Sequence, residues 1–176
     1  MSSTVNIEPL TKAHNRIGFD CGNQALNHFL QKIARQHRDK GLSKTFVLID
    51  TEQPTKIIAY MSLVMCEVLT EDIPHQWKKK YPSRIPAAKL AKLAVSIDQQ
   101  RKGYGETLLI DAIQKTLNVS KTMGLAGLFV DAKHKQAKTY YQQFGFLSLP
   151  EQLDNLFMPL STIDESFTTK NTSEAN

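Results

Sequence analysis

Cysteine, metal-ligand histidine pairs and long apolar runs are scarce or missing in this 176-residue chain, and each absence excludes a class of protein. Cys21 and Cys66 are too few and too far apart for a disulfide framework or a metal cluster, so we expect two buried thiols. The five histidines show no metal-ligand spacing, which predicts surface histidines and no metal. No apolar run approaches the length that spans a bilayer, so we expect no contact with a membrane.

Signatures of other protein classes are also missing. The sequence has neither a Gly-x-Ser-x-Gly elbow nor a reactive-cysteine motif, so no motif in it indicates a hydrolase. The first residues lack a basic region followed by an apolar one, so we expect a cytoplasmic protein. No repeat or linker divides the chain, which predicts one domain at residues 1–163 and a polar, disordered tail at 164–176.

A glycine turn between two apolar segments is the most informative feature that is present. Its sequence is Gln100-Arg101-Lys102-Gly103-Tyr104-Gly105. The two glycines permit a tight turn, and the apolar residues of 108–117 recur at helical spacing, so backbone N–H groups should point outward where a helix begins. The positive end of a helix dipole favours an anion, and a pyrophosphate fits this arrangement.

Two better-known phosphate loops do not fit. A Walker A motif needs Lys-Ser/Thr after its last glycine, but Glu106-Thr107 follows Gly105. A dinucleotide-binding turn needs a third glycine, and Leu108 occupies that position. On these residues alone, an ordinary strand-to-helix turn remains the alternative.

A second motif follows an apolar run at 125–130. In residues 136–146, Ala137, Tyr140, Tyr141 and Phe144 share one helical face, and Gly145 can take the left-handed position that ends the helix. The motif resembles Ala-x-x-Phe-Tyr-x-x-x-Gly-Phe of the GNAT acetyltransferase superfamily. The glycine turn likewise resembles the Gln/Arg-x-x-Gly-x-Gly/Ala motif of that superfamily.

The resemblance implies a fold, a cosubstrate and a set of contacts. The fold is the GNAT type of α/β (α+β) fold, a mixed, mostly antiparallel central sheet flanked by helices and splayed at the acetyl-CoA site. Acetyl-CoA is implied as the acetyl donor, without a metal. Arg101 departs from the many relatives that carry glycine there. The implied cofactor-binding residues are Leu93, Ala94, Val95, Gln100, Arg101, Lys102, Gly103, Tyr104 and Gly105.

The N-terminal third narrows the resemblance to one branch. Residues 19–26 and 45–48 are similar to the GNAT toxins of bacterial toxin–antitoxin pairs. That similarity implies acetylation of the α-amino group of aminoacyl-tRNA, which blocks translation. It also implies neutralisation by a ribbon-helix-helix antitoxin, and a homodimer.

Apolar patterning and turn residues predict the order of elements. We expect a first helix capped by Asn23 or Asp20, and a basic segment that is largely loop because of prolines 74, 82 and 86. The expected strands are Val5–Pro9, Thr45–Asp50, Ile57–Leu69, Leu90–Ile97, a strand ending at Asp131, one near Phe146 and Leu156–Leu160, and the first helix is Gln24–Arg38.

Positive charge is concentrated in the body of the chain. The total is 22 Lys and Arg against 17 Asp and Glu, and the acidic tail leaves +7 on residues 1–163. Basic and aromatic residues in two stretches suit phosphates and exposed bases, although solvated surface charge is the plain alternative. The implied tRNA-binding residues are Lys32, Arg35, Arg38, Trp77, Lys78, Lys79, Lys80, Arg84, Lys89 and Lys92.

The acidity of the acceptor amine limits what the enzyme must supply. An α-amino group, with a pKa of about 7.7–8.0, is partly neutral at pH 7, whereas lysine at about 10.4 is not, so a strong base is dispensable. Glu67 and Asp131 are the candidate bases if one is used. Tyr141 is the predicted catalytic residue, as donor to the leaving thiolate. Core packing is the alternative role, for which Tyr140 is the better candidate.

Two other functions remain open. The first is a GNAT enzyme that acetylates a small amine or a protein amine, which the basic segment disfavours because small cationic amines prefer acidic pockets. The second is a non-catalytic module that binds CoA or nucleic acid and regulates a partner.

Overall fold

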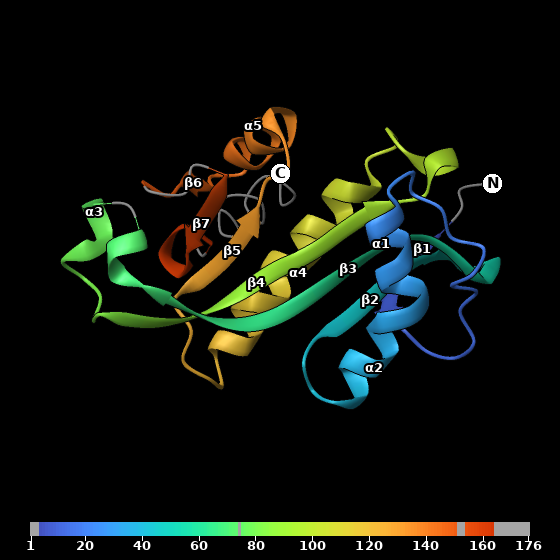
Figure 1. Cartoon of the computed structure of the whole chain (residues 1–176), viewed down its shortest axis with the longest axis horizontal. Coiled ribbons are helices and arrows are strands. Elements are labelled where there is room, and N and C mark those ends of the chain that lie inside the picture. The colour runs from blue at the N-terminus through green and yellow to red at the C-terminus, as the bar shows by residue number, and fades with distance from the viewer. Residues whose placement is uncertain (1–3, 74, 151–153, 164–176) are drawn as a thin grey trace, which may run out of the picture. The chain divides into compact units, whose positions relative to one another are not determined.

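Seven strands form one sheet in this computed structural model, which describes residues 4–73, 75–150 and 154–163 (Figure 1). The neighbouring strands β1 and β2, β2 and β3, β5 and β7, and β6 and β7 pair antiparallel. The predicted fold class, α/β with a mostly antiparallel sheet, is confirmed, and the predicted tail lies outside the described residues. In sheet order the strands are β1 (Val5–Pro9), β2 (Lys44–Asp50), β3 (Gln53–Leu69), β4 (Arg84–Val95), β5 (Gly127–Asp131), β7 (Asn155–Pro159) and β6 (Leu147–Ser148).

The predicted first helix is interrupted by a wider turn. A π-helical segment, in which the amide of Ala34 donates to the carbonyl of Phe29, joins its two α-helical parts. The side chain of Asn23 accepts from the amide of Leu26, which confirms this residue as the cap. The helical elements are α1 (Gln24–His28), η1 (Phe29–Ile33), α2 (Ala34–Asp39), η2 (Thr70–Asp72), α3 (His75–Lys78), η3 (Ile97–Gln99), α4 (Tyr104–Ser120) and α5 (Lys135–Gln143).

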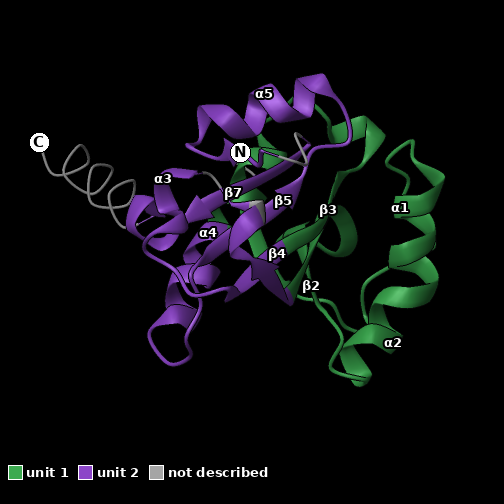
Figure 2. Ribbon diagram, turned by 60° about the vertical axis from the view of Figure 1, so that its left-hand side comes forward, with its two compact units in different colours: residues 1–64, 90–112 green, residues 65–89, 113–176 purple. Residues whose placement is uncertain are grey.

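The chain divides into two compact units, each made of two sequence segments (Figure 2). Unit 1 comprises residues 1–64 and 90–112, and unit 2 comprises residues 65–89 and 113–176. Strands β3 and β4 and helix α4 contribute residues to both. A single domain over residues 1–163 stays a prediction.

An aromatic cluster around Tyr60 organises the core of unit 1. The Tyr60 ring meets the edge of Phe19 at 5.5 Å between centroids and stacks on Phe29 at 6.3 Å. Its hydroxyl donates to the carbonyl of Leu26 at 2.7 Å, so the buried polar atom has a partner, and burial raises the pKa of Tyr60. These contacts fix the first helix against β2 and β3.

Phe157 has the same central position in unit 2. Its ring stacks on Phe129 at 4.5 Å, and Trp77 meets its edge at 5.5 Å. Gly127 lies in β5, opposite β7, the strand that contains Phe157. A Cβ on Gly127 would collide with the carbonyl oxygen of Met158 and the ring of Phe157. Backbone and ring therefore approach so closely that only glycine fits at this position of β5.

The expectation that the basic segment is loop up to residue 89 is wrong. Strand β4 begins at Arg84 and includes Pro86, whose carbonyl accepts from the amide of Ala126 at 2.8 Å. Ile85 and Ala87 are buried while Arg84 and Pro86 are exposed, which is the alternation of a strand. Proline disfavours a strand because it lacks a backbone N–H, but Pro86 still accepts a hydrogen bond through its carbonyl.

Two expectations about burial are also corrected. His14 is only 4% exposed, and its Nε2 lies 2.7 Å from Oε1 of Glu8, so it is an interior histidine and not a surface one. Cys21 and Cys66 are half-buried thiols rather than fully buried ones. Among the described residues, no cluster of three or more His, Cys, Asp or Glu could hold a metal, and no helix is long and apolar enough to cross a bilayer.

Candidate active site

The glycine turn of unit 1 leads from the end of β4 through η3 into α4. Gly103 has φ +85°, and a Cβ there would meet no atom within 4 Å. Arg101 also has a positive φ, +63°, which is costly for a residue with a Cβ and which a glycine would adopt without strain. Of the two predicted glycines, Gly103 takes the positive φ of a tight turn, whereas Gly105 lies within the 17-residue helix α4, whose first amides follow the turn.

Gln100 holds this turn in place. Its side-chain nitrogen donates to the carbonyl of Val95 at 3.0 Å and to the carbonyl of Cys21 at 3.1 Å. A second bond to the loop before α1 runs from the amide of Ile97 to the carbonyl of Asp20 at 2.9 Å. The loop before α1 therefore anchors the turn, and a direct contact of Gln100 with a cofactor stays a prediction.

The other predicted cofactor residues of the turn have distinct environments. Arg101 is exposed, and the ammonium of Lys102 donates to Oε1 of Gln99 at 3.1 Å. In β4, Ala94 is buried in the core, whereas Leu93 and Val95 are half-buried on the opposite face. Tyr104 and Gly105 are half-buried at the start of α4, and a Cβ on Gly105 would lie 3.8 Å from Cγ2 of Val95.

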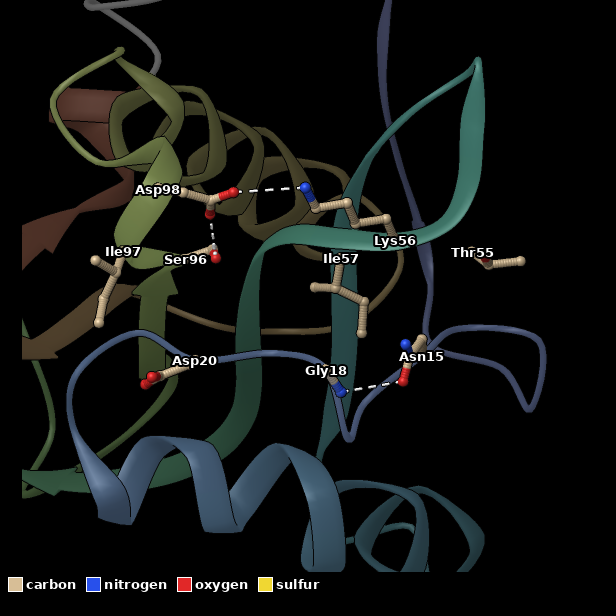
Figure 3. A pocket seen from close by; sticks show the side chains of 9 residues that line it. All are labelled: Asn15, Gly18, Asp20, Thr55, Lys56, Ile57, Ser96, Ile97 and Asp98. Atoms are coloured by element: carbon tan, nitrogen blue, oxygen red, sulfur yellow. Dashed lines mark hydrogen bonds and ion pairs between the residues drawn. The ribbon is translucent and has the colours of Figure 1, made fainter.

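A cavity of about 580 Å³ lies in unit 1 and was not predicted from the sequence (Figure 3). Asp98 stands at its wall, where the carboxylate accepts from the hydroxyl of Ser96 at 2.7 Å and lies 3.4 Å from the ammonium of Lys56. The hydrogen bond from Ser96 is the main cause that lowers the pKa of Asp98. The Ser-x-Asp spacing, which favours such local bonds, was the available signal.

Tyr141 lies in unit 2, on α5. The side chain of His134 caps this helix by accepting from the amide of Ala137 at 3.1 Å, and Gly145 follows it with φ +96°, as predicted. Tyr141 is 8% exposed, and burial is the main cause that raises its pKa to about 12, with smaller contributions from Tyr140 and Asp131. The phenol is therefore protonated at neutral pH and is a weak acid.

Both candidate bases line a second cavity, which belongs wholly to unit 2 and has a volume of about 340 Å³. Nζ of Lys89 lies 2.7 Å from Oδ2 of Asp131. Nη1 of Arg84 lies 2.7 Å from Oε1 of Glu67. Each carboxylate is thus paired with a cation. A role of Glu67 or Asp131 as a base stays a prediction.

The predicted tRNA-binding residues fall in both units. In unit 1, Lys32 is exposed, Arg38 donates to the carbonyl of Leu10 at 3.0 Å, and the ammonium of Lys92 lies 5.4 Å from the centre of the Phe29 ring. The buried Nε of Arg35 has no hydrogen-bond partner within the described part of the chain. Lys92 and Arg38 thus have structural contacts as well as charge.

The other predicted tRNA-binding residues belong to unit 2. Lys79 and Lys80 are exposed, and Lys78 is half-buried. Trp77 and Tyr81 pack against the core of this unit, a structural role that the sequence interpretation missed. Their contact with tRNA stays a prediction, as does a groove shared by the two basic sets.

The chain matches a family and several characterised relatives. A profile described as "Acetyltransferase (GNAT) family" matches residues 12–146. A tRNA-acetylating toxin from Mycobacterium tuberculosis is 28% identical over 137 residues, which cover 78% of this chain and 81% of that protein. The structure of AtaT complexed with acetyl-methionyl-tRNAfMet is similar with a TM-score of 0.85 and 32% identity, over 93% of this chain and 99% of that one. A Tyr-to-Phe mutant of AtaT, bound to the C-terminus of the antitoxin AtaR and acetyl-CoA, has a TM-score of 0.77 and 30% identity, over 94% and 99%.

Proposed function

Because the chain belongs to the GNAT family of acetyltransferases, we propose that it transfers the acetyl group of acetyl-CoA to the α-amino group of aminoacyl-tRNA. The observation that carries this proposal is its similarity, over 93% of its length, to AtaT, which was solved with acetyl-methionyl-tRNAfMet. An acetylated α-amine cannot attack a peptidyl ester, so the product blocks translation in the cytoplasm.

The glycine turn is the proposed pyrophosphate cradle of acetyl-CoA. Open space above Gly103 and the first amides of α4 suit a diphosphate, and Arg101 and Lys102 add positive charge beside them. Acetyl-CoA supplies an activated thioester, while the backbone of Leu93 and Val95 is proposed to pair with its amide groups.

Tyr141 is the proposed donor to the leaving thiolate. The neutral amine attacks the thioester carbonyl, an N–C bond forms, the C–S bond breaks, and the amine proton is lost to water. A phenol with a pKa of about 12 holds its proton more tightly than a thiol near 8.5. Tyr141 therefore stabilises the thiolate by a hydrogen bond as charge develops, and solvent finally protonates the sulfur.

An antitoxin and a second copy of the chain are the proposed protein partners. AtaT was solved bound to the C-terminus of its antitoxin AtaR. A cognate antitoxin of the ribbon-helix-helix type would neutralise the present enzyme, which we propose to be a homodimer. Full acetyltransferase activity of a purified complex with that antitoxin would contradict the first part.

Transfer of labelled acetyl from acetyl-CoA to a pool of charged tRNAs tests the function. We expect label on charged tRNA and none on uncharged tRNA or added polyamine. Label only on polyamines or peptides would overturn the proposal and favour the small-amine or protein-amine enzyme. No consumption of thioester with any amine would favour the non-catalytic module.

A matched pair of variants tests Tyr141. We expect Tyr141→Phe to lower kcat by about a hundredfold, the lower end of the range for a positioned proton donor, while KM for acetyl-CoA changes little. Tyr140→Phe removes the hydroxyl of the neighbouring tyrosine, whose ring centroid lies 5.6 Å from that of Tyr141, and should keep most of the turnover. Equal kcat for Tyr141→Phe and the unmodified enzyme would exclude Tyr141 from the mechanism.

A further inference from the structure

The unit-1 cavity of about 580 Å³ contains none of the residues predicted to bind acetyl-CoA or tRNA or to act in catalysis. Its lining comes from the loop before α1, from the start of β3, and from the residues that lead from β4 into η3 (Figure 3). All of these segments belong to unit 1. Because pockets for small ligands usually have volumes of about 300–1,000 Å³, the cavity is large enough for a small molecule that the proposed chemistry does not use.

A carboxylate stands on one side of this cavity with an oxygen to spare. The side chain of Asp20 accepts from the amide of Gly22 at 2.8 Å and from Nδ2 of Asn27 at 2.9 Å. Both bonds fall on Oδ1, and Oδ2 has no partner among the described residues. The same two bonds lower the pKa of Asp20, so it is an anion at neutral pH. Asp20 can therefore accept a hydrogen bond from a ligand ammonium through Oδ2.

Hydrogen-bond donors stand away from Asp20, on the other side of the cavity in Figure 3. Nζ of Lys56 lies 3.4 Å from Oδ2 of Asp98, beyond the normal range of about 2.7–3.2 Å for such a bond. An ammonium has three donors, so Lys56 can also bind a second anion. Oδ1 of Asn15 accepts from the amide of Gly18 at 3.0 Å, and the two donors of its Nδ2 remain for a ligand. This side of the cavity suits a carboxylate.

Apolar surface lies between the two polar sides. The side chain of Ile57 projects between Asp20 and Asn15 in Figure 3, and Ile97 belongs to the lining although 55% of its surface is exposed. A ligand that covers an exposed isoleucine removes apolar surface from water, which favours binding. The cavity thus combines an acceptor, a set of donors and an apolar contact.

We propose that this cavity binds a small zwitterion of the size of a free amino acid. Its ammonium bonds to Asp20, its carboxylate bonds to Lys56 and Asn15, and its side chain covers Ile97. A ligand with one charge leaves either the carboxylate or the ammonium of the protein without a new partner, whereas a zwitterion serves both.

The ligand should also strengthen cofactor binding, and this part rests on the proposed function. The loop that carries Asp20 anchors the glycine turn, because the carbonyl of Asp20 accepts from the amide of Ile97 at 2.9 Å and the carbonyl of Cys21 accepts from Gln100 at 3.1 Å. A ligand that joins Asp20 to Lys56 restrains this loop and lowers the cost of ordering the turn. By linkage, the zwitterion and the cofactor then raise each other's affinity by the same factor.

Calorimetric titration with L-leucine, in the absence of cofactor, tests the class of ligand. Two derivatives each remove one charge, since L-leucine methyl ester lacks the carboxylate and N-acetyl-L-leucine lacks the ammonium. We expect each derivative to bind about tenfold or more weakly than leucine, because each loses charged hydrogen bonds. Equal affinity of either derivative would overturn the zwitterion, and absence of leucine binding at millimolar concentration would overturn the whole inference.

Substitutions that remove charge and keep shape test the location. Asp20→Asn keeps an oxygen for the existing hydrogen bonds, and both this change and Lys56→Gln should weaken leucine binding about tenfold. Asp50→Asn is the control for the first, because Asp50 likewise accepts from the amide two residues on, at 2.9 Å, and lies outside the lining. Lys12→Gln, at an exposed position outside the lining, is the control for the second. Unchanged affinity in both cavity variants would overturn the inference.

Titration with CoA, with and without leucine, tests the coupling. CoA has the diphosphate of the cofactor but no acetyl group, so no reaction consumes it. We expect leucine to lower the Kd for CoA by about fivefold or more, and Asp20→Asn to abolish this effect. An unchanged Kd for CoA while leucine binds would overturn the coupling. Failure of CoA to bind at all would instead overturn the proposed function, while the leucine site is judged by the first titration.

Discussion

Tyr141 is a weaker acid than a tyrosine in water, so its ionisation should not limit activity on the alkaline side. Its pKa is raised to about 12, so the donating form persists over the whole accessible alkaline range. We expect kcat/KM to rise from pH 6 to about 8 as the acceptor amine, with an ordinary pKa of about 7.7–8.0, loses its proton, and then to stay level to pH 10. A pH–rate profile on freshly charged tRNA measures this, and a fall centred near pH 10 that is absent in Tyr141→Phe would contradict it.

The buried His14 should contribute to stability and not to catalysis. Its Nδ1 accepts from the amide of Thr11 at 3.0 Å, and its Nε2 lies 2.7 Å from Glu8. His14→Ala leaves these groups without their partner and should cost about 1–3 kcal/mol in the free energy of unfolding, measured by urea titration. The exposed His28 is the control, and a loss as large in His28→Ala would contradict this reading.

At the scale of elements, the features that depend on residues close together in the sequence could be predicted. Gly145 takes the left-handed conformation that its place after an amphipathic helix predicts, and β1 has the predicted bounds. The π-helical turn at 29–33 carries no residue-level signal, because a 3.6-residue pattern does not reveal one extra residue in a turn. Prolines 82 and 86 favour a loop because proline lacks a backbone N–H, whereas in the structure the residues around Ile85 alternate as part of β4.

The candidate site rests partly on local motifs and partly on contacts between distant residues, and the roles of its residues stay predictions. The turn of residues 100–105 and Tyr141 follow from motifs of neighbouring residues, and both have the expected local structure. The clamp of Gln100 on Cys21, 79 residues apart, and the ion pair of Lys89 with Asp131 depend on tertiary contacts. No periodicity within one segment can specify such pairs.

The position of Gly127 in β5 gives a prediction for that strand. A methyl group there would enter space occupied by the backbone of Met158, so Gly127→Ala should lower the free energy of unfolding by about 1–3 kcal/mol. Thermal unfolding measures the loss. Gly124→Ala is the matched control, because a Cβ there meets nothing within 4 Å, and equal midpoints for the two variants would refute the argument.

At the scale of the whole molecule, the excess of positive charge predicts salt-sensitive recognition of tRNA. Releasing counterions from a single strand changes log K by about 0.7 per phosphate contact for each unit of log salt. We expect KM for charged tRNA to rise steeply between 50 and 200 mM salt, on the order of such slopes, while KM for acetyl-CoA changes less. Replacing the exposed Lys79 and Lys80 by alanine should reduce the slope, whereas Lys121→Ala, on a separate exposed loop, should not. Equal salt dependence of KM in all variants would indicate that residues 78–80 are solvated surface and do not contact tRNA.

The two units interleave along the chain, which passes from one to the other after residues 64, 89 and 112. Neither unit corresponds to a continuous stretch of the gene. A single recombination crossover between relatives within residues 65–112 would therefore combine halves of both units from different parents, and exchanging one intact unit requires three crossovers.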